Sequence, residues 1–287
     1  MVTRLRAATV CLLALLTALG IVLVTSIPPT QAVITASIAN SGDTAGAVLQ
    51  NCRFAISRIA ATSPSDLYAA YAISGTSSAS ETDISGNGRI GTWRKQPTIS
   101  SSVGCTHDDP AQSVTFDGSQ CLYVPGVLNN PSTFSLEAWF STTTIPNGKI
   151  VGFGSSPTPE DEGGYDRHIY IDNTGRVALG LFAGGFTTIF TPPGTSYADG
   201  RWHAVVATVS SGVARLYVDG TLVGTKTNAS PASYTGYWKF GCGKTALWPN
   251  TPQNAPMFFT GNLQYGAIYD RALTAGEVQS HWLDGTW

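Results

Sequence analysis

Short runs of apolar and alternating residues dominate the chain from residue 113 onward. Two of the longest are F-S-L-E-A-W-F at residues 134–140 and W-H-A-V-V-A-T-V at residues 202–209. D-G and N-G dipeptides, which accept the positive φ of tight hairpin turns, begin at residues 117, 147, 199 and 219. Many short strands at this spacing predict an all-β sandwich or barrel.

The strand over residues 202–209 has two apolar faces. Trp202, Ala204 and Val206 alternate with Val205 and Ala207, so the pattern predicts a central strand that is covered on both sides. We expect Trp202, and likewise Trp139 and Trp238, to pack in the core rather than contact a ligand.

The segments outside the strand-rich region are less regular. Residues 56–73 are compatible with a helical turn followed by a strand, and residues 74–110, rich in Ser, Gly and Thr, are expected to form loops. One helix closes the chain, because T-A-G-E at residues 274–277 is a capping box and Val278 and Trp282 share one helical face.

Two long segments resemble a known family. D-G-R-W-H-A-V-V-A-T-V-S-S-G-V-A-R-L-Y-V-D-G-T-L-V-G at residues 199–224 resembles the most recognisable hairpin of laminin-G-like domains, in the concanavalin A-like lectin/glucanase superfamily. F-F-T-G-N-L-Q-Y-G-A-I-Y-D-R-A-L-T-A-G-E-V-Q-S-H-W at residues 258–282 resembles their closing strand and short helix. The resemblance covers about residues 65–287 and implies a two-sheet antiparallel jelly-roll sandwich with a short C-terminal helix.

The N-terminal residues predict export. Arg4 and Arg6 precede an apolar run that ends near Ile27, and T-Q-A follows at residues 30–32, so residues 1–32 are expected to be a signal peptide cleaved after Ala32. The alternative is an uncleaved membrane anchor, because about 20 apolar residues can span a bilayer. Residues 33–51 are expected to be a flexible linker or arm, and residues 52–287 the laminin-G-like domain. T-A-S-I-A-N-S-G-D-T at residues 35–44 resembles the start of secreted surface proteins of Gram-positive bacteria that carry such a domain.

Export changes the interpretation of the cysteines. Cys52, Cys105, Cys121 and Cys242 follow the predicted signal, and an even number in an oxidising compartment indicates two disulfides. Three pairings are possible. A short strand and a D-G turn separate Cys105 from Cys121, which favours Cys52 with Cys105 and Cys121 with Cys242. We expect a secreted or extracellular protein, with association to the cell surface as a further option.

Charge and motifs argue against several functions. The formal net charge is only −2, so there is no basic field for nucleic acid. G-C-G-K-T at residues 241–245 looks like the end of a phosphate-binding loop, but residue 238, where the loop needs its first glycine, is Trp, and Pro249 and Pro252 interrupt the required helix. No nucleotide is therefore expected, and Lys244 is interpreted as a solvated charge.

Catalysis is not the favoured interpretation. Glycoside hydrolysis needs two carboxylates about 5–10 Å apart across the scissile bond. Glu137 lies in a predicted strand without an acidic partner at residues 135 or 139, and the acidic cluster at residues 160–162 lies in a proline-containing loop. We therefore expect no enzyme activity, with a glycosidase as the least favoured alternative.

The loop over residues 155–168 carries the candidate binding groups. Its carboxylates Asp161, Glu162 and Asp166 are candidate Ca²⁺ ligands, because Ca²⁺ prefers oxygen ligands on a flexible loop. Laminin-G-like domains often hold Ca²⁺ at the rim of the sandwich, whereas a solvated acidic loop is the alternative. The candidate ligand-binding residues are Tyr165, Arg167, His168, Trp248 and Asn250, with Tyr234 and Tyr237 as further rings that could stack on sugars.

These observations predict a secreted, noncatalytic recognition or adhesion module. Its expected partner is a glycan or another cell-surface polymer, with Ca²⁺ as a candidate cofactor. A structural surface protein that binds extracellular protein partners is the alternative. Neither nucleic acid nor a nucleotide is expected, and membrane contact is expected only if the N-terminal segment stays uncleaved.

Overall fold

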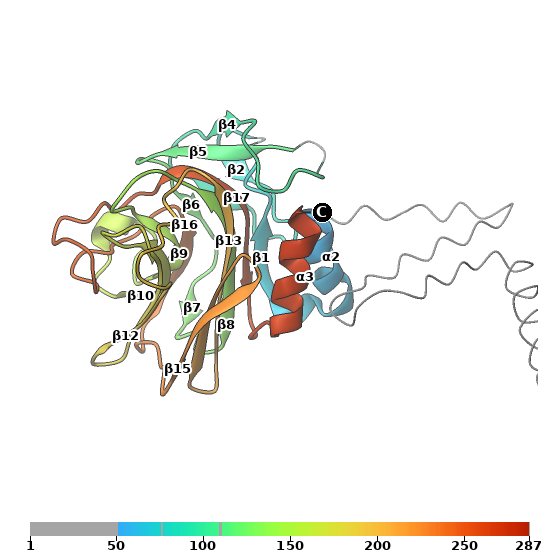
Figure 1. The fold of residues 1–287 in the computed structure, drawn as a ribbon. Helices are drawn as coiled ribbons and strands as arrows, with labels where there is room; N and C mark the ends of the chain where they lie inside the picture. Colours follow the sequence, from blue (N-terminus) through green and yellow to red (C-terminus); the bar gives the residue numbers. More distant parts are fainter. Residues whose placement is uncertain (1–50, 76, 109–110, 287) are drawn as a thin grey trace, which may run out of the picture. The chain divides into compact units, whose positions relative to one another are not determined.

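Two antiparallel β-sheets stacked face to face form the body of the protein (Figure 1). The computed structural model describes residues 51–75, 77–108 and 111–286. The predicted signal segment and all but the last residue of the predicted linker lie outside the described residues. The jelly-roll sandwich expected from the resemblance is confirmed.

The first sheet has eight strands and contains the hairpin that carries the resemblance. β13 lies between β14 and β8, with Val205 opposite Val218 on one side and Ala138 on the other, so it is central as predicted. In spatial order the strands are β15 (Thr221–Thr227), β14 (Val213–Val218), β13 (Trp202–Ser210), β8 (Phe134–Ser141), β17 (Thr260–Tyr269), β5 (Ser113–Asp117) and β4 (Thr98–Ser100), and β1 (Leu67–Tyr71) also pairs with β17.

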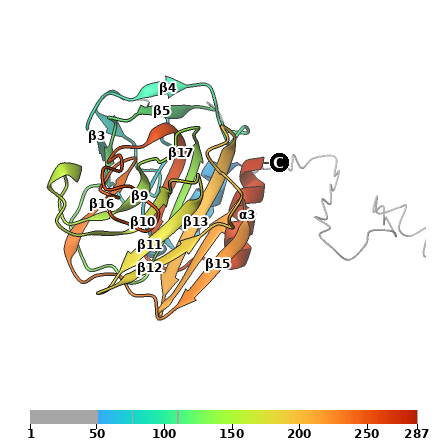
Figure 2. The ribbon, with the colours of Figure 1, turned by 60° about the vertical axis from the view of Figure 1, so that its left-hand side comes forward.

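The second sheet has nine strands, of which β9 to β12 lie side by side (Figure 2). In spatial order they are β12 (Phe186–Phe190), β11 (Val177–Phe182), β10 (Tyr165–Ile171), β9 (Lys149–Gly154), β16 (Thr235–Phe240), β6 (Leu122–Tyr123), β3 (Gly91–Trp93) and β2 (Ser80–Glu81), and β7 (Leu128–Asn129) pairs with β16.

The main core lies between the sheets, and a second apolar layer covers the first sheet. Val205 and Ala207 of β13 face the main core, while Ala204 and Val206 lie beneath two helices, α2 (Cys52–Thr62) and α3 (Ala275–Thr286) (Figure 1). This arrangement explains why both faces of β13 are apolar. Trp139 and Trp238 are buried as expected, and Trp202, although half-buried, packs against the second apolar layer.

Helix α3 begins as its sequence predicts. The Glu277 N–H donates to Thr274 Oγ1 at 3.2 Å, and the Thr274 N–H donates back to the Glu277 carboxylate at 2.7 Å. These reciprocal bonds satisfy two backbone groups and stabilise the start of the helix. Val278 and Trp282 both face the sheet, and Trp282 stacks on Trp139.

The segment before β5 differs from the sequence prediction. Residues 74–110, which were expected to form loops, contain the short strands β2, β3 and β4. The helical turn followed by a strand that was expected over residues 56–73 is confirmed by α2 and β1, with a 3₁₀ turn (Pro64–Asp66) between them. The buried carboxylate of Glu81 accepts hydrogen bonds from the N–H groups of Ser74 and Gly75, at 3.0 and 3.1 Å. Strands of two or three residues are too short to show an alternating pattern, so these strands were not readable from the sequence.

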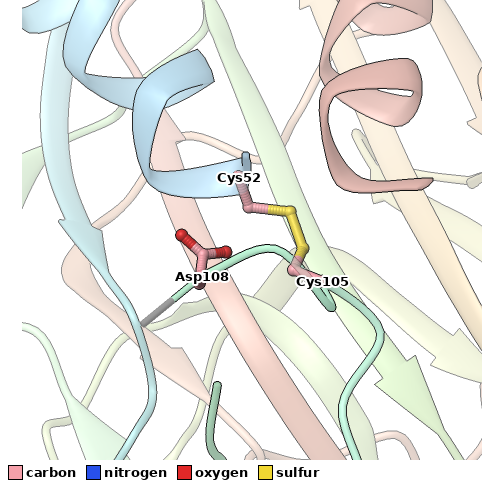
Figure 3. A group of neighbouring side chains, drawn as sticks. All are labelled: Cys52, Cys105 and Asp108. Atoms are coloured by element: carbon pink, nitrogen blue, oxygen red, sulfur yellow. A yellow bond between two sulfur atoms is a disulfide. The ribbon is translucent and has the colours of Figure 1, made fainter. Parts of the chain in front are cut away.

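Two disulfides tie distant segments together. Cys52 at the start of α2 is bonded to Cys105 (Figure 3), and Cys121 is bonded to Cys242, just after β16. This is the pairing that the sequence favours. Within the described residues, no helix is long and apolar enough to cross a membrane.

Candidate functional site

The outer face of the nine-stranded sheet carries Trp248 directly against its strands. Gly180 on β11 makes this approach possible, since a Cβ there would lie 2.5 Å from the indole. The same indole packs edge-on against His168 of β10, with ring centroids 4.1 Å apart, and only 4% of Trp248 is exposed. The loop after β16 is therefore folded back over the sheet.

A groove of about 390 Å³ opens beside Trp248. This size falls within the range of small-molecule sites. Its rim includes Phe186 and Leu247, whose exposed fractions, 52% and 64%, are large for apolar side chains. We call it the aromatic groove, and its lining residues are Gly163, Gly164, Tyr165, Asp166, Phe182, Phe186, Ala232, Tyr234, Ala246, Leu247 and Trp248.

A buried ion cluster fixes the loop that forms one wall of this groove. Glu162 reaches back over the sheet, where its Oε1 lies 2.7 Å from Lys239 Nζ and its Oε2 lies 3.8 Å from Lys149 Nζ. All three side chains are fully buried. Burial lowers the pKa of Lys149 to about 8, although the charge of Glu162 opposes this shift. The cluster holds the neighbouring Gly163 and Gly164 in place.

A second buried pair supports the other wall. Asp166 Oδ1 accepts a 2.5 Å hydrogen bond from Arg167 and a 2.8 Å hydrogen bond from the Tyr234 hydroxyl. Its Oδ2 accepts from the Ala232 N–H at 2.8 Å. Burial raises the pKa of Asp166 above its ordinary value of 3.8, although Arg167 and the hydrogen bonds oppose the rise. The pair joins β10 to the loop that precedes β16.

The predicted ligand-binding residues do not all reach one surface. Tyr165 and Trp248 line the aromatic groove. Arg167 is fully buried, with its guanidinium 4.9 Å from the ring centroids of both Phe153 and Tyr234, so it supports the groove from behind. Asn250 is exposed but does not line the groove.

His168 lies beneath Trp248 rather than at the surface. It is fully buried, and neither ring nitrogen has a hydrogen-bond partner among the described residues. Burial, and to a lesser extent the charge of Lys149, holds the pKa of His168 well below 6.5. The imidazole is therefore neutral and serves as packing for the indole.

The three carboxylates of the predicted calcium site point to different partners. Glu162 is engaged by the lysines and Asp166 by Arg167 and Tyr234, while Asp161 is exposed and its Oδ2 accepts from the Thr158 hydroxyl at 2.6 Å. They do not converge as one ligand set.

The closely spaced group of potential metal ligands that the described residues do contain is Cys52, Cys105 and Asp108 (Figure 3). Its two sulfurs are bonded to each other, so they are not available as thiolates. We therefore do not treat this group as a candidate metal site.

Lys244 differs from its predicted setting, whereas Glu137 lies in strand β8 as predicted. Lys244 is half-buried, and its Nζ donates to the Glu162 carbonyl at 2.7 Å, so it is not a solvated charge. Glu137 is buried beneath α3, where it accepts from the Tyr269 hydroxyl at 2.6 Å and lies 3.0 Å from His281 Nδ1. Its partners thus come from β17 and α3, and neither Glu137 nor Glu162 lines the groove.

Sequence reasoning missed part of the groove. Phe182 and Phe186 flank A-G-G at the hairpin between β11 and β12, and Leu247 precedes Trp248. The ring of Phe186 packs edge-on against those of Phe182 and Trp248, at centroid distances of 5.3 and 5.0 Å. Two aromatic residues around a glycine turn could have indicated a binding surface. The sequence near the turn, however, does not show that it lies beside residue 248.

A comparison with protein families finds one match. Residues 116–279 match the model of a laminin-G domain family described as the concanavalin A-like lectin/glucanases superfamily. The matched range includes every residue that lines the aromatic groove. A sequence search of curated proteins finds no match.

Solved structures share the fold at low sequence identity. Domain 4 of AbnA, a GH43 extracellular arabinanase from Geobacillus stearothermophilus solved with arabinotriose, matches with a TM-score of 0.50 and 16% identity over 75% of this chain and 98% of its own. The binding domain of Paraclostridial Mosquitocidal Protein 1 matches with a TM-score of 0.55 and 14% identity, over 76% of this chain and 52% of its own. A Trypanosoma rangeli sialidase solved with the inhibitor DANA matches with a TM-score of 0.50 and 13% identity, over 76% of this chain but only 32% of its own.

Proposed function

The chain belongs to the concanavalin A-like lectin/glucanase superfamily, and from this premise we propose that its aromatic groove binds a glycan without cleaving it. The protein would act as an extracellular recognition or adhesion module. Since this fold serves both binding domains and glycosidases, the proposal rests on the groove and not on the fold.

The observation that carries the proposal is the aromatic lining of the groove. Five rings line it, those of Tyr165, Phe182, Phe186, Tyr234 and Trp248. Sugar rings present faces of C–H groups, which can be buried against aromatic surfaces with a gain from the hydrophobic effect and dispersion. Gly163 and Gly164 also line the groove, and a Cβ at Gly164 would lie 3.4 Å from the Tyr234 ring.

The carboxylates support binding rather than hydrolysis. Asp166 is the one carboxylate among the groove-lining residues, and both of its oxygens already accept hydrogen bonds. A glycosidase needs a second carboxylate about 5–10 Å away across the scissile bond. Glu137 and Glu162 are sequestered elsewhere, by His281 and Tyr269 and by the two lysines respectively.

The setting of the protein supports an extracellular role. Disulfides persist in oxidising compartments, and the structure contains two of them. The predicted signal segment agrees with export. Binding to a polymer outside the cell is therefore the function that the groove, the disulfides and the N-terminal sequence jointly support.

A calorimetric titration with neutral and acidic oligosaccharides tests the proposal, using the wild type and Phe186→Ala. We expect saturable binding to at least one oligosaccharide, weakened about tenfold or more in the variant, because burying an exposed Phe side chain contributes about 1.5–3 kcal/mol. Ile99→Ala is the matched control, since Ile99 is 51% exposed and lies on β4 of the other sheet.

Two results would contradict the proposal. If no oligosaccharide binds, the groove is not a glycan site, and the exposed Phe186 and Leu247 fit a protein partner better. Release of reducing sugar from any member of the panel, at a rate above that of heat-denatured protein, would show that the protein is a hydrolase.

A further inference from the structure

The aromatic groove offers an entering ligand no counter-ion. Asp166 is the one charged residue among those that line it, and its carboxylate is already neutralised by Arg167. Neither lysine nor arginine is present in the lining. A ligand with a carboxylate or sulfate would therefore have to be desolvated there without a cationic partner.

The nearest cations are all committed to other groups. Arg167 donates from Nε to the Pro131 carbonyl at 2.8 Å, and from its terminal nitrogens to Asp166, Asn130 and the Ala232 carbonyl. The side chain is fully buried between two aromatic rings. Turning it toward the groove would break these bonds.

The three lysines near the groove are similarly held. Lys239 pairs with Glu162 and also donates to the Ser156 carbonyl at 2.5 Å, and Lys244 donates to the Glu162 carbonyl. Lys149 is fully buried 5.9 Å from the centre of the Tyr165 ring. Its Nζ has no hydrogen-bond partner among the described residues, and Glu162 Oε2, 3.8 Å away, is its counter-ion. None of them lines the groove.

The polar groups of the lining are also largely occupied. The N–H groups of Gly163 and Gly164 donate to Ser155 Oγ at 3.0 and 2.9 Å, and the Tyr234 hydroxyl donates to Asp166. What the groove presents outward is ring surface and the apolar side chain of Leu247. Binding there must come mainly from apolar contact.

We propose that the aromatic groove selects uncharged sugars, bound through the apolar faces of their rings, and discriminates against acidic sugars such as uronates and sialic acid. This inference rests on the proposed function and names its substrate class. The physical reason is the cost of burying a charge that finds no partner, which far exceeds the cost of burying a hydroxyl.

The test compares oligosaccharides that differ mainly in charge. Sialyllactose is paired with its methyl ester, and an oligogalacturonate with its fully methyl-esterified form of equal length, each titrated calorimetrically into the wild-type protein. We expect the neutral member to bind at least tenfold more tightly in each pair that binds. Its affinity should be unchanged between low and high salt, because salt screens only charge interactions.

A gain-of-function variant supplies the missing cation. Leu247→Lys places an ammonium on the exposed rim, and we expect it to raise the affinity for the acidic member at least tenfold and, because an apolar lining side chain is lost, not to raise the affinity for the neutral member. Ile99→Lys, which adds the same charge at another exposed position, on the other sheet, should change neither affinity. Unchanged thermal unfolding midpoints show that both variants remain folded.

The outcomes separate this inference from the function on which it rests. Equal or tighter binding of the acidic member to the wild type would overturn the selectivity while leaving glycan binding in place. If Leu247→Lys does not raise the affinity for the acidic member, the missing cation is not the cause of the selectivity. Absence of binding by every oligosaccharide would instead overturn the proposed function, and the selectivity with it.

Discussion

Glu162 Oε1 lies 2.7 Å from Lys239 Nζ, and neither side chain has any exposed surface. This ion pair fastens a surface loop onto the outer face of the nine-stranded sheet. Gly154 leaves the space that the Glu162 carboxylate fills, because a side chain at residue 154 would collide with it. A segment of glycines and carboxylates is typical of a solvated loop, but here the ion pair makes the loop one wall of the aromatic groove.

Removing Glu162 should be costly. Glu162→Ala leaves Lys239 and Lys149 buried without their counter-ion, so we expect the free energy of unfolding to fall by about 3–5 kcal/mol. Urea denaturation measures this change. Glu160→Ala is the matched control in the same loop, because Glu160 forms only a solvent-exposed pair with Arg94, and we expect a loss below about 1 kcal/mol. Equal losses in the two variants would mean that the loop is not anchored by Glu162.

The Glu137–His281 pair should make the docking of α3 depend on pH. Burial alone would lower the pKa of His281, but Glu137 outweighs it and raises that pKa above 6.5. Burial alone would raise the pKa of Glu137, but His281 and the Tyr269 hydroxyl hold it below 4.5. The interaction of protonated His281 with Glu137 stabilises the folded state. Its contribution is fully present below pH 6.5 and is lost as the pH rises through the folded-state pKa of His281.

The lowered pKa of Glu137 acts in the other direction: its contribution is present above pH 4.5 and is lost in stronger acid. The wild type should therefore exceed His281→Gln in stability most clearly near pH 5–6, and the difference should shrink by pH 9. Each unit by which folding raises the pKa of His281 adds about 1.4 kcal/mol. A difference that is constant from pH 5 to 9 would rule out a charged pair.

The two disulfides should differ in their contribution to stability. Cys121 and Cys242 are 121 residues apart in sequence, and Cys52 and Cys105 are 53 apart. Loop-closure entropy predicts that the longer link contributes about 0.7 kcal/mol more, within a typical total of about 2–5 kcal/mol for each bond. Urea unfolding of two variants, each with both cysteines of one disulfide replaced by Ser, measures both contributions. A larger loss in the free energy of unfolding on removing the Cys52–Cys105 bond would contradict the entropic account.

Chelation of calcium should not abolish glycan binding. Glu162 and Asp166 are committed to buried partners, so of the three predicted ligands Asp161 is the one with an exposed side chain. We expect the affinity for a neutral oligosaccharide to agree within about twofold in excess Ca²⁺ and in EDTA. Loss of binding in EDTA, with recovery on adding Ca²⁺, would show that the loop rearranges to hold the ion.

Most of the fold could be predicted from sequence because its signals are local. Alternation along β13, the D-G turn at Asp219 and the capping box at Thr274 each act within a few residues. The short strands β2 and β3 were not predicted, since two or three residues show no periodicity. They pair with each other, and β3 also pairs with β6, which lies further along the chain.

The site was less predictable because it depends on which loops meet. Arg167 and Glu162 belong to a segment of glycines and carboxylates that is typical of a solvated loop. They are buried because residues 232–234 and 243–248 fold over them. The local sequence pattern does not predict this packing. Tyr165 and Trp248 were identified by residue type alone. Their position beside Phe186 depends on the tertiary fold and could not be predicted.

The indole N–H signal of Trp248 tests the central claim most directly. The chain has seven tryptophans, and a ¹H–¹⁵N spectrum with Trp248→Phe as the assignment control distinguishes this one from the other six. Titration with a neutral oligosaccharide that binds calorimetrically should shift the Trp248 signal saturably, with the same affinity, and leave the buried Trp139 and Trp238 signals in place. Saturable binding that leaves Trp248 unmoved and shifts signals elsewhere would place the glycan outside the aromatic groove and contradict the account.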